Sequence, residues 1–525
     1  MFFGFAVTFK GTAHAAACAE VPVELAPLGH YSVGWGIDRR NTRYQPKAQL
    51  NSANAAGLRL KWAYGLGSNN PRAYPLITTD TIYIGSDGEG LLALDRNTGC
   101  ERWRHFQEGQ FGSAIVPAFA NGRAMLVFNI RQRGVFAVDA NNGELIWHAK
   151  VEDQPVPWYS GTPVVTSDTV YVPVSSMEVG IAINPLYGCC TTTGGLAAFD
   201  LATGAKRWFI PTIDEPARKT GSHYFLVSEY GPSGAAVWAT PSYEAEQQRL
   251  YFGTGQNYSH PTTDTSNAIF AVDAASGEIQ WIEQYTPNDA YNASCNAISL
   301  DHPNCPKPLG PDVDFGAPTM LLYGQDGQLR LIAGQKSSEV HALDPQTGKR
   351  LWSRRLGRGG IIGGVHWGMA ANERLGLVYV PISDKALPNY PSPGAPEPGL
   401  YALDITTGEV RWHHNRAPRC DTLACVYGLS AAAIAANDVV VAGSIDGFLE
   451  VLHAATGEVL WSHDAWREYD TINATPASGG GFDAHGAFLA DDLLVVSSGY
   501  AYVGDQRPGN ALLVFELADE AADND

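Results

Sequence analysis

The sequence predicts an all-β protein, an eight-bladed β-propeller closed by its N- and C-terminal strands. Two observations lead to this fold. The pattern Ala-x-Asp-x-x-x-Gly-x-x-x-Trp recurs with constant internal spacing along most of the 525 residues. A further pair of short β-rich runs precedes each copy, as in residues 74–84 and 161–172. Repeats of about 40 residues or more with four strands each are typical of propeller blades.

Each copy of the pattern is interpreted as a β-hairpin. An apolar strand ends at Asp, the turn requires a residue that tolerates positive φ and has Gly, and the next strand presents a Trp. We expect these Trp rings to fill the space between neighbouring blades. Complete copies begin at Ala93, Ala137, Ala198, Ala271, Ala342 and Ala402, and a degenerate copy ends with Gly457 and Trp461.

Two incomplete units give the blade count. Residues 58–62 look like an outer strand without its own blade, and residues 512–515 look like part of a blade that lacks its last strand. Pairing these ends completes an eighth blade. We therefore expect a signal peptide over residues 1–19, one propeller domain over residues 28–517 and a disordered acidic tail over residues 518–525.

Composition excludes some partners and indicates export. The net charge of −19, without a cluster of Lys or Arg, argues against a nucleic-acid partner. No apolar run approaches the ~20 residues that a membrane span needs. The apolar first residues and the small residues near position 19 are typical of a secretory signal.

The cysteines support an oxidising compartment. Three pairs lie close in sequence, which favours disulfides, and Cys18 with Cys100 then remains by elimination. The three close pairs are Cys189 with Cys190, Cys295 with Cys305, and Cys420 with Cys425. No Cys-x-x-Cys-His motif is present, so the sequence offers no attachment site for a c-type haem.

The candidate site residues stand at corresponding positions in successive repeats. A disulfide between the adjacent Cys189 and Cys190 would make a rigid platform. Glu178 lies at the end of a β-rich run in the same repeat. In each of the next two repeats, side chains with oxygen atoms lie where the corresponding strand ends or begins. These are Gln256, Asn257, Asp312 and Asp314. Oxygen ligands of this kind suit a hard cation such as Ca²⁺.

Two further residues point to a planar cofactor. Trp238 lies outside the Trp repeat, so blade packing does not explain it, and its ring is suited to stacking. Lys336 directly follows the apolar strand at residues 329–334 and is placed to reach the central axis.

With these residues, the chain resembles the quinoprotein alcohol dehydrogenases, which bind pyrroloquinoline quinone (PQQ) in an eight-bladed propeller. The Trp pattern is similar to their tryptophan-docking motif over roughly residues 30–517. Residues 253–259, 310–316, 498–500 and 508–513 look most like the polyvinyl alcohol dehydrogenases of that family. The resemblance implies cofactor contacts from Cys189, Cys190, Trp238, Lys336 and Trp367. It implies metal ligands from Glu178, from Asn257 or Gln256, and from the pair Asp312 and Asp314, which also supplies the catalytic base.

The resemblance leaves alternatives open. In many family members the vicinal Cys pair precedes the metal-binding Glu, whereas here it follows Glu178. Counting from Trp238 places Gln256 rather than Asn257 at the ligand position. If Asp312 is the base, Asp314 adds a charge that favours a lanthanide ion. If Asp314 is the base, Gly316 stands two residues on, as expected of a Ca²⁺ site.

The function implied by the resemblance is periplasmic oxidation of alcohols, secondary alcohols and polyvinyl alcohol among them. The cation would polarise the quinone, an Asp would take the hydroxyl proton, and hydride would pass to the quinone. Without a haem motif, electrons would leave to a separate soluble cytochrome c. The alternative is a non-catalytic periplasmic propeller scaffold of the outer-membrane-assembly type. That alternative explains the Trp repeat. It does not explain the adjacent Cys189 and Cys190, or why Glu178 and Asp312 stand at corresponding positions of their repeats.

Overall fold

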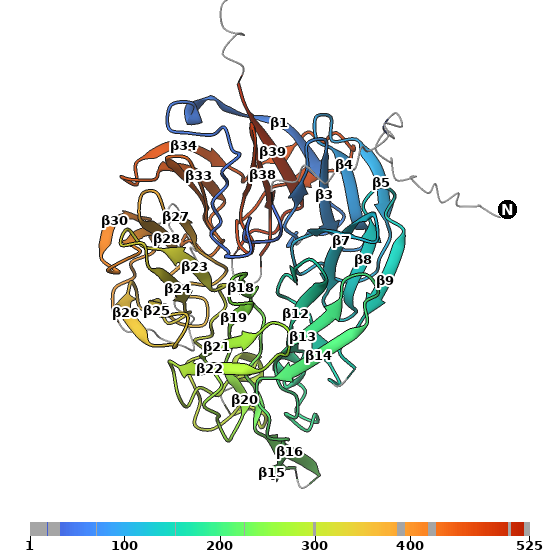
Figure 1. Ribbon diagram of the computed structural model, residues 1–525, viewed down its shortest axis with the longest axis vertical. Coiled ribbons are helices and arrows are strands. Elements are labelled where there is room, and N and C mark those ends of the chain that lie inside the picture. The colour runs from blue at the N-terminus through green and yellow to red at the C-terminus, as the bar shows by residue number, and fades with distance from the viewer. Residues whose placement is uncertain are drawn as a thin grey trace, which may run out of the picture.

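The computed structural model forms the predicted propeller. It describes residue 18 and residues 32–69, 71–152, 154–224, 226–297, 301–385, 394–417, 427–501 and 506–518. These residues build eight antiparallel blades around a central axis, and chain order runs around the ring (Figure 1). The strands are short and their inner members are buried on both faces, because each blade is covered by its two neighbours.

The first four blades have the following strands. Blade 1 contains β2 (Leu76–Ile77), β3 (Thr81–Ser86), β4 (Gly90–Asp95) and β5 (Glu101–His105). Blade 2 contains β6 (Val116–Ala120), β7 (Arg123–Ile130), β8 (Gly134–Asp139) and β9 (Leu145–Ala149). Blade 3 contains β11 (Val164–Val165), β12 (Thr169–Ser176), β13 (Gly195–Asp200) and β14 (Lys206–Pro211), and β10 (Pro157–Trp158) also pairs with β12. Blade 4 contains β18 (Ser242–Glu244), β19 (Arg249–Gly253), β21 (Ala268–Asp273) and β22 (Ile279–Gln284).

The remaining blades follow the same order. Blade 5 contains β23 (Met320–Tyr323), β24 (Leu329–Gly334), β25 (Glu339–Leu343) and β26 (Arg350–Arg355). Blade 6 contains β27 (Ala370–Asn372), β28 (Leu377–Ile382), β29 (Gly399–Asp404) and β30 (Val410–Asn415). Blade 7 contains β31 (Ile434–Ala436), β32 (Val439–Gly443), β33 (Phe448–His453) and β34 (Val459–Asp464). Blade 8 contains β37 (Phe488–Ala490), β38 (Leu493–Ser498), β39 (Ala511–Leu517) and β1 (Leu58–Gly65).

Several short elements lie outside the eight four-stranded blades. The helical turns are η1 (Ala55–Gly57), α1 (Glu178–Ile181) and α2 (Ser294–Ala297). Three small two-stranded sheets pair β15 (Arg218–His223) with β16 (Val227–Gly231), β17 (Ser233–Gly234) with β20 (Asn257–Ser259), and β35 (Glu468–Tyr469) with β36 (Ala477–Ser478). Of these, α1, α2 and the first two sheets belong to the enlarged third, fourth and fifth repeats, which also carry most of the candidate site residues.

The closure predicted from the two half-blades is confirmed. Strand β1 pairs antiparallel with β39, with Leu58 opposite Leu517 and Gly65 opposite Ala511. The N-terminal strand therefore completes the last blade and ties the two ends of the propeller together.

The Trp repeat joins neighbouring blades in a specific way. Trp147 Nε1 donates to the carbonyl of Leu201, 2.8 Å away in the next blade, and the ring covers Gly204. Gly204 has φ +72°, and a Cβ there would lie 2.8 Å from the Trp147 ring, so both conformation and space require glycine. The same Trp-over-Gly contact recurs at Gly99, Gly143, Gly277, Gly348, Gly408 and Gly457.

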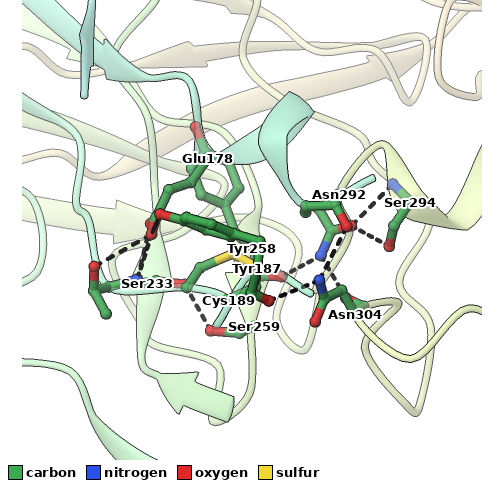
Figure 2. The surroundings of a disulfide bond; sticks show 12 residues. Glu178, Tyr187, Cys189, Ser233, Tyr258, Ser259, Asn292, Ser294 and Asn304 are labelled. Carbon is green, nitrogen blue, oxygen red and sulfur yellow. Dashed lines mark hydrogen bonds between the residues drawn. A yellow bond between two sulfur atoms is a disulfide. The ribbon is translucent and has the colours of Figure 1, made fainter. Parts of the chain in front are cut away.

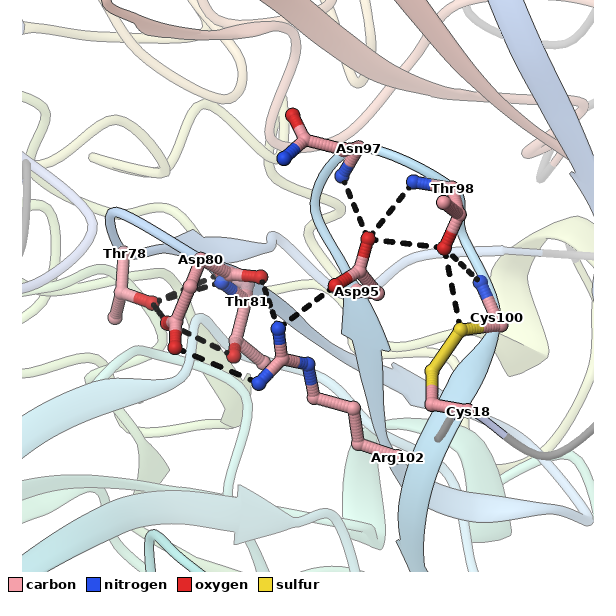
Figure 3. A network of polar contacts seen from close by, with 9 residues as sticks. All are labelled: Cys18, Thr78, Asp80, Thr81, Asp95, Asn97, Thr98, Cys100 and Arg102. Carbon is pink, nitrogen blue, oxygen red and sulfur yellow. Dashed lines mark hydrogen bonds and ion pairs between the residues drawn. A yellow bond between two sulfur atoms is a disulfide. The ribbon is translucent and has the colours of Figure 1, made fainter. Parts of the chain in front are cut away.

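The Asp of the pattern holds its own turn together. In blade 1, Asp95 Oδ1 accepts hydrogen bonds from the backbone of Asn97 (3.0 Å) and Thr98 (2.8 Å), as an Asx turn does (Figure 3). Arg102 then bridges Asp95 and Asp80 from the neighbouring turn. Each invariant position of the pattern thus has a structural role, so the repeat itself carries no information about catalysis.

The disulfide between Cys18 and Cys100, predicted by elimination, is present in this blade (Figure 3). Cleavage after residue 19 would remove Cys18, so the predicted signal-peptide boundary and this disulfide cannot hold in one molecule. The other residues of the predicted signal peptide, the pair Cys420 and Cys425, and tail residues 519–525 lie outside the described residues. Within those residues, no helix has the length and apolar character needed to span a bilayer.

Candidate active site

Glu178 is fully buried where β12 ends and α1 begins. Its carboxylate accepts hydrogen bonds from the backbone N–H of Thr191 (2.8 Å) and Thr192 (2.7 Å), from the Thr192 hydroxyl (2.6 Å) and from the Tyr187 hydroxyl (2.7 Å). Thr191 and Thr192 directly follow the Cys pair in sequence. The segment that contains the vicinal disulfide therefore also orients the predicted metal-binding carboxylate.

The vicinal disulfide between Cys189 and Cys190 is present and buried (Figure 2). It forms an apolar cluster with Tyr258, and Trp238 packs against that cluster. The structure therefore brings together the two predicted faces of a cofactor slot, Trp238 and the disulfide. Tyr258, which the sequence reasoning did not identify, lies in the same cluster.

Asp314 lies at the centre of the charged groups. Its carboxylate accepts hydrogen bonds from Trp238 Nε1 (3.0 Å), Lys336 Nζ (3.1 Å) and the backbone N–H of Gln256 (2.9 Å). Lys336 Nζ also lies 5.3 Å from the centre of the Trp238 ring. Asp314 is therefore positioned at the edge of the Trp238 platform, with a cation beside it.

Asp312 lies on the other side of Lys336 and is held differently. Its backbone has φ +54°, and its N–H donates to Asp289 at 3.0 Å. Lys336 Nζ is 3.5 Å from its carboxylate. Burial raises the pKa of the Asp312 carboxyl well above its usual range, and the Lys336 charge offsets only part of this shift. Burial alone would lower the pKa of Lys336, but Asp312 and Asp314 together raise it, so the ammonium stays charged.

Asn257 and Gln256, the two candidates for the amide ligand, have different hydrogen-bond partners. The Asn257 side chain is engaged in its own loop, where Nδ2 donates to Ser233 O (3.0 Å) and Oδ1 accepts from Thr263 N (3.0 Å). Gln256 instead contacts Asp314 through its backbone, and its Nε2 donates to Tyr291 O at 3.2 Å. The structure thus brings Gln256, rather than the Asn257 side chain, to the charged centre.

The carboxylates of Glu178 and Asp314, which come from different repeats, both act on the buried hydroxyl of Tyr258. Burial raises the pKa of the Tyr258 hydroxyl, and the charges of Asp314 and Glu178 raise it further. Two carboxylates thus act on one buried hydroxyl, and the donors there suit a hard cation. The described residues contain no group of three or more His, Cys, Asp or Glu side chains placed to hold a metal. A cation would therefore draw part of its ligand set from amide oxygen or from a bound cofactor.

Comparison with known proteins identifies the family. Residues 33–300 match the model of the PQQ glucose/ethanol/alcohol dehydrogenase β-propeller domain, and residues 327–512 match that of outer membrane protein assembly factor BamB. The chain is 34% identical to a polyvinylalcohol dehydrogenase of Sphingopyxis sp. (strain 113P3), covering 94% of this chain and 76% of that relative. A polyvinylalcohol dehydrogenase of Pseudomonas sp. is 32% identical, covering 94% and 78%. This chain is a PQQ-dependent alcohol dehydrogenase.

A solved structure agrees in fold. The quinohemoprotein alcohol dehydrogenase from Comamonas testosteroni superposes with a TM-score of 0.68 at 20% identity, over 94% of this quinoprotein and 81% of that chain. The match of residues 327–512 to the assembly-factor model fits the repeat, because Trp docking and Asp turns serve blade packing in any propeller of this kind.

The residues present in this quinoprotein fit PQQ, which carries three carboxylates and two quinone oxygens. Arg72 lies 4.6 Å from the Trp367 ring and, like Lys336, brings positive charge to the site. Arg72 Nε is a buried donor that makes no hydrogen bond of standard geometry within the described residues, whereas the Trp367 side chain interacts with the buried Asp483 carboxyl. Trp367 in turn packs edge-on against Trp238, with ring centres 5.8 Å apart. An unpaired guanidinium donor suits an anionic ligand.

Sequence reasoning missed several residues of this site. Arg72 precedes β2 in a loop without any motif, and nothing in the sequence indicated it. Tyr258 directly follows Asn257, and Thr191 follows Cys190, so adjacency to a candidate was a usable signal. His366 neighbours Trp367 and bonds Ser430 at 2.9 Å. Burial, with the charges of Lys336 and Arg72, lowers the pKa of His366 well below its usual value, so the imidazole is neutral.

Proposed function

We propose that this enzyme oxidises secondary alcohol groups, including those of polyvinyl alcohol, to carbonyls. The observation that carries this proposal is the buried arrangement of Lys336 between Asp312 and Asp314, directly against Trp238. Buried charges are costly to a fold unless they are paired, and they cluster where chemistry uses them. The names of the two similar relatives support the choice of substrate.

The chain's own residues would share the work as follows. Bound PQQ would supply the two-electron acceptor for the hydride of the alcohol carbon. Trp238 and the Cys189–Cys190 platform would hold a planar ring between them, and Arg72 would bind anionic groups at its edge. Asp314, at the edge of Trp238, would remove the hydroxyl proton. Lys336 would place a positive charge beside the Asp314 carboxylate, 3.1 Å away.

The metal assignment follows from the same geometry. We propose Glu178, the side-chain oxygen of Gln256 and Asp314 as protein ligands of a cation that acts as a Lewis acid. With Asp314 as the base, the residue two positions on is Gly316, so no additional carboxylate is present there. We therefore favour Ca²⁺ over a lanthanide ion.

The partner and location remain those implied by the family resemblance. We propose a periplasmic enzyme that passes its electrons to a separate soluble cytochrome c, because the sequence has no haem-attachment motif. The alternative scaffold function is supported by the assembly-factor match at residues 327–512. It gives no role to buried Lys336 or to the carboxylates that flank it.

A dye-linked assay with added PQQ and Ca²⁺ tests the substrate proposal. Purified protein is given polyvinyl alcohol, small secondary alcohols and small primary alcohols of equal carbon number. We expect kcat/KM to be higher for secondary than for primary hydroxyls, and we expect reduction of the dye with the polymer. Higher kcat/KM for primary alcohols, with no turnover of the polymer, would refute the proposed substrate class.

A further inference from the structure

Three insertions, one each from the third, fourth and fifth repeats, meet beside the vicinal disulfide. They are residues 182–188 after α1, the hairpin β15–β16, and residues 302–309. Asn304 Nδ2 donates to the carbonyls of Ala182 (3.1 Å), Asn184 (3.0 Å) and Tyr187 (3.0 Å), which joins the first insertion to the third. Figure 2 shows Asn304 beside Tyr187. We call these segments the three-insertion wall.

The hairpin is attached to the same wall. His223 Nε2 contacts the Pro185 carbonyl at 2.8 Å. Tyr230 N donates to Cys189 O at 2.8 Å, and Cys190 N donates to Tyr230 O at 3.2 Å. The disulfide Cys295–Cys305 fixes the base of the third insertion. The wall is therefore a built structure that is anchored to the cofactor platform.

A cavity of about 680 Å³ is lined by the hairpin β15–β16, the third insertion and residues 259–262, and Cys189 is one of its lining residues. The lining includes the hydroxyl, amide and carboxylate groups of Thr220, Glu229, Tyr230, Ser259, Thr262 and Asn304, together with two histidines, three prolines, Cys305 and Lys307. Cavities of about 300–1,000 Å³ hold molecules much larger than a simple alcohol. The size and lining therefore suit an extended ligand with many hydroxyl groups.

Exposed apolar side chains project from the same insertions. Leu226, at the hairpin turn, is 91% exposed, and Leu186 in the first insertion is 71% exposed. Ile183, Tyr224 and Leu309 are also exposed large apolar residues of the wall. Large exposed apolar side chains on segments beside a cavity that carries polar groups are typical of a binding surface.

We propose that the three-insertion wall binds a segment of an extended polymer that has a hydrocarbon backbone and regularly spaced secondary hydroxyl groups. This proposal rests on the proposed function. The exposed Leu and Ile side chains contact the methylene groups, and the polar cavity lining hydrogen-bonds the hydroxyls. Because Cys189 is one of the residues that line the cavity, a segment bound there lies next to the platform on which the quinone is held.

The test uses the double variant Leu186→Asp/Leu226→Asp, whose changes lie on exposed side chains and leave the core unaltered. Phe106→Asp, at a 64%-exposed side chain in blade 1, is the matched control. Two quantities are measured: binding of polyvinyl alcohol to the PQQ-free protein, and kcat/KM with polyvinyl alcohol and with pentane-2,4-diol. We expect the double variant to lose about tenfold or more in polymer affinity and in kcat/KM for the polymer. We expect its kcat/KM for the diol to match that of the wild type and of the control.

The outcomes separate this proposal from the proposed function. Unchanged polymer binding by the double variant, or no polymer binding by the wild type, overturns the polymer site. An equal loss for the diol and the polymer also overturns it, as does a change confined to the KM of the electron acceptor, which would indicate a protein-docking surface. If the wild type binds the polymer and the double variant does not, but neither oxidises any alcohol, the polymer site stands and the proposed function fails.

Discussion

Asp314→Asn is expected to lower kcat by about 10²–10⁴-fold, with PQQ still bound, because the change removes the proton acceptor and keeps the shape of the side chain. The amide can still accept from Trp238 Nε1 or Lys336 Nζ, which lie at 3.0 Å and 3.1 Å from the carboxylate. The measurement is kcat in the dye-linked assay, with PQQ affinity determined separately by titration.

Asp312→Asn is the matched control, since it removes the other carboxylate beside Lys336. The Asp312 carboxyl has a raised pKa and is farther from the ammonium, at 3.5 Å, and the hydrogen bond of Trp238 Nε1 goes to Asp314 instead. We expect a smaller loss of kcat than with Asp314→Asn. If the losses are reversed, Asp312 is the base, Asp314 becomes an additional ligand, and a lanthanide ion replaces Ca²⁺ as the favoured cation.

Glu178→Ala is expected to abolish turnover and Ca²⁺ binding without unfolding the propeller. The side chain lies at the end of β12 and contacts Tyr187, Thr191 and Thr192 rather than a neighbouring blade's Trp. Calcium affinity is measured by calorimetry in the presence of PQQ, and folding by circular dichroism. Undiminished turnover at saturating PQQ and Ca²⁺ would mean that Glu178 is not a metal ligand.

Thr192→Val tests how much the orientation of the Glu178 carboxylate contributes to metal binding. It removes one hydroxyl donor, 2.6 Å from the carboxylate, and leaves the backbone N–H donors in place. We expect weaker Ca²⁺ binding than in the wild type but stronger binding than in Glu178→Ala. Calcium affinity equal to that of Glu178→Ala would indicate that Thr192 has a larger role than orientation.

The fold could be predicted from the sequence because every blade repeats the same three contacts. Asp95 holds its turn, Gly204 admits the Trp147 ring, and β1 pairs with β39 where the two half-blades indicated it. Each contact is local or joins adjacent repeats, so spacing alone encodes it. The predicted disulfide between Cys189 and Cys190 follows from the same local reasoning.

The site was less accessible to sequence reasoning because it joins residues from different blades. Spacing could not distinguish Asp312 from Asp314, and only the contacts of Trp238 and Lys336 separate them. Gln256 and Asn257 are neighbours in sequence, yet their side chains have different partners because β20 begins between them. Arg72 reaches the site from a loop of blade 1, and no motif marks that loop.

The central claim is that PQQ binds between Trp238 and the Cys189–Cys190 disulfide. The most direct measurement is an equilibrium titration of the PQQ-free protein with PQQ in the presence of Ca²⁺, followed by absorbance and by tryptophan fluorescence. We predict binding of one equivalent with quenching of fluorescence, and weaker binding in Trp238→Ala. Absence of binding to the wild type, or equal affinity in Trp238→Ala, would contradict this account.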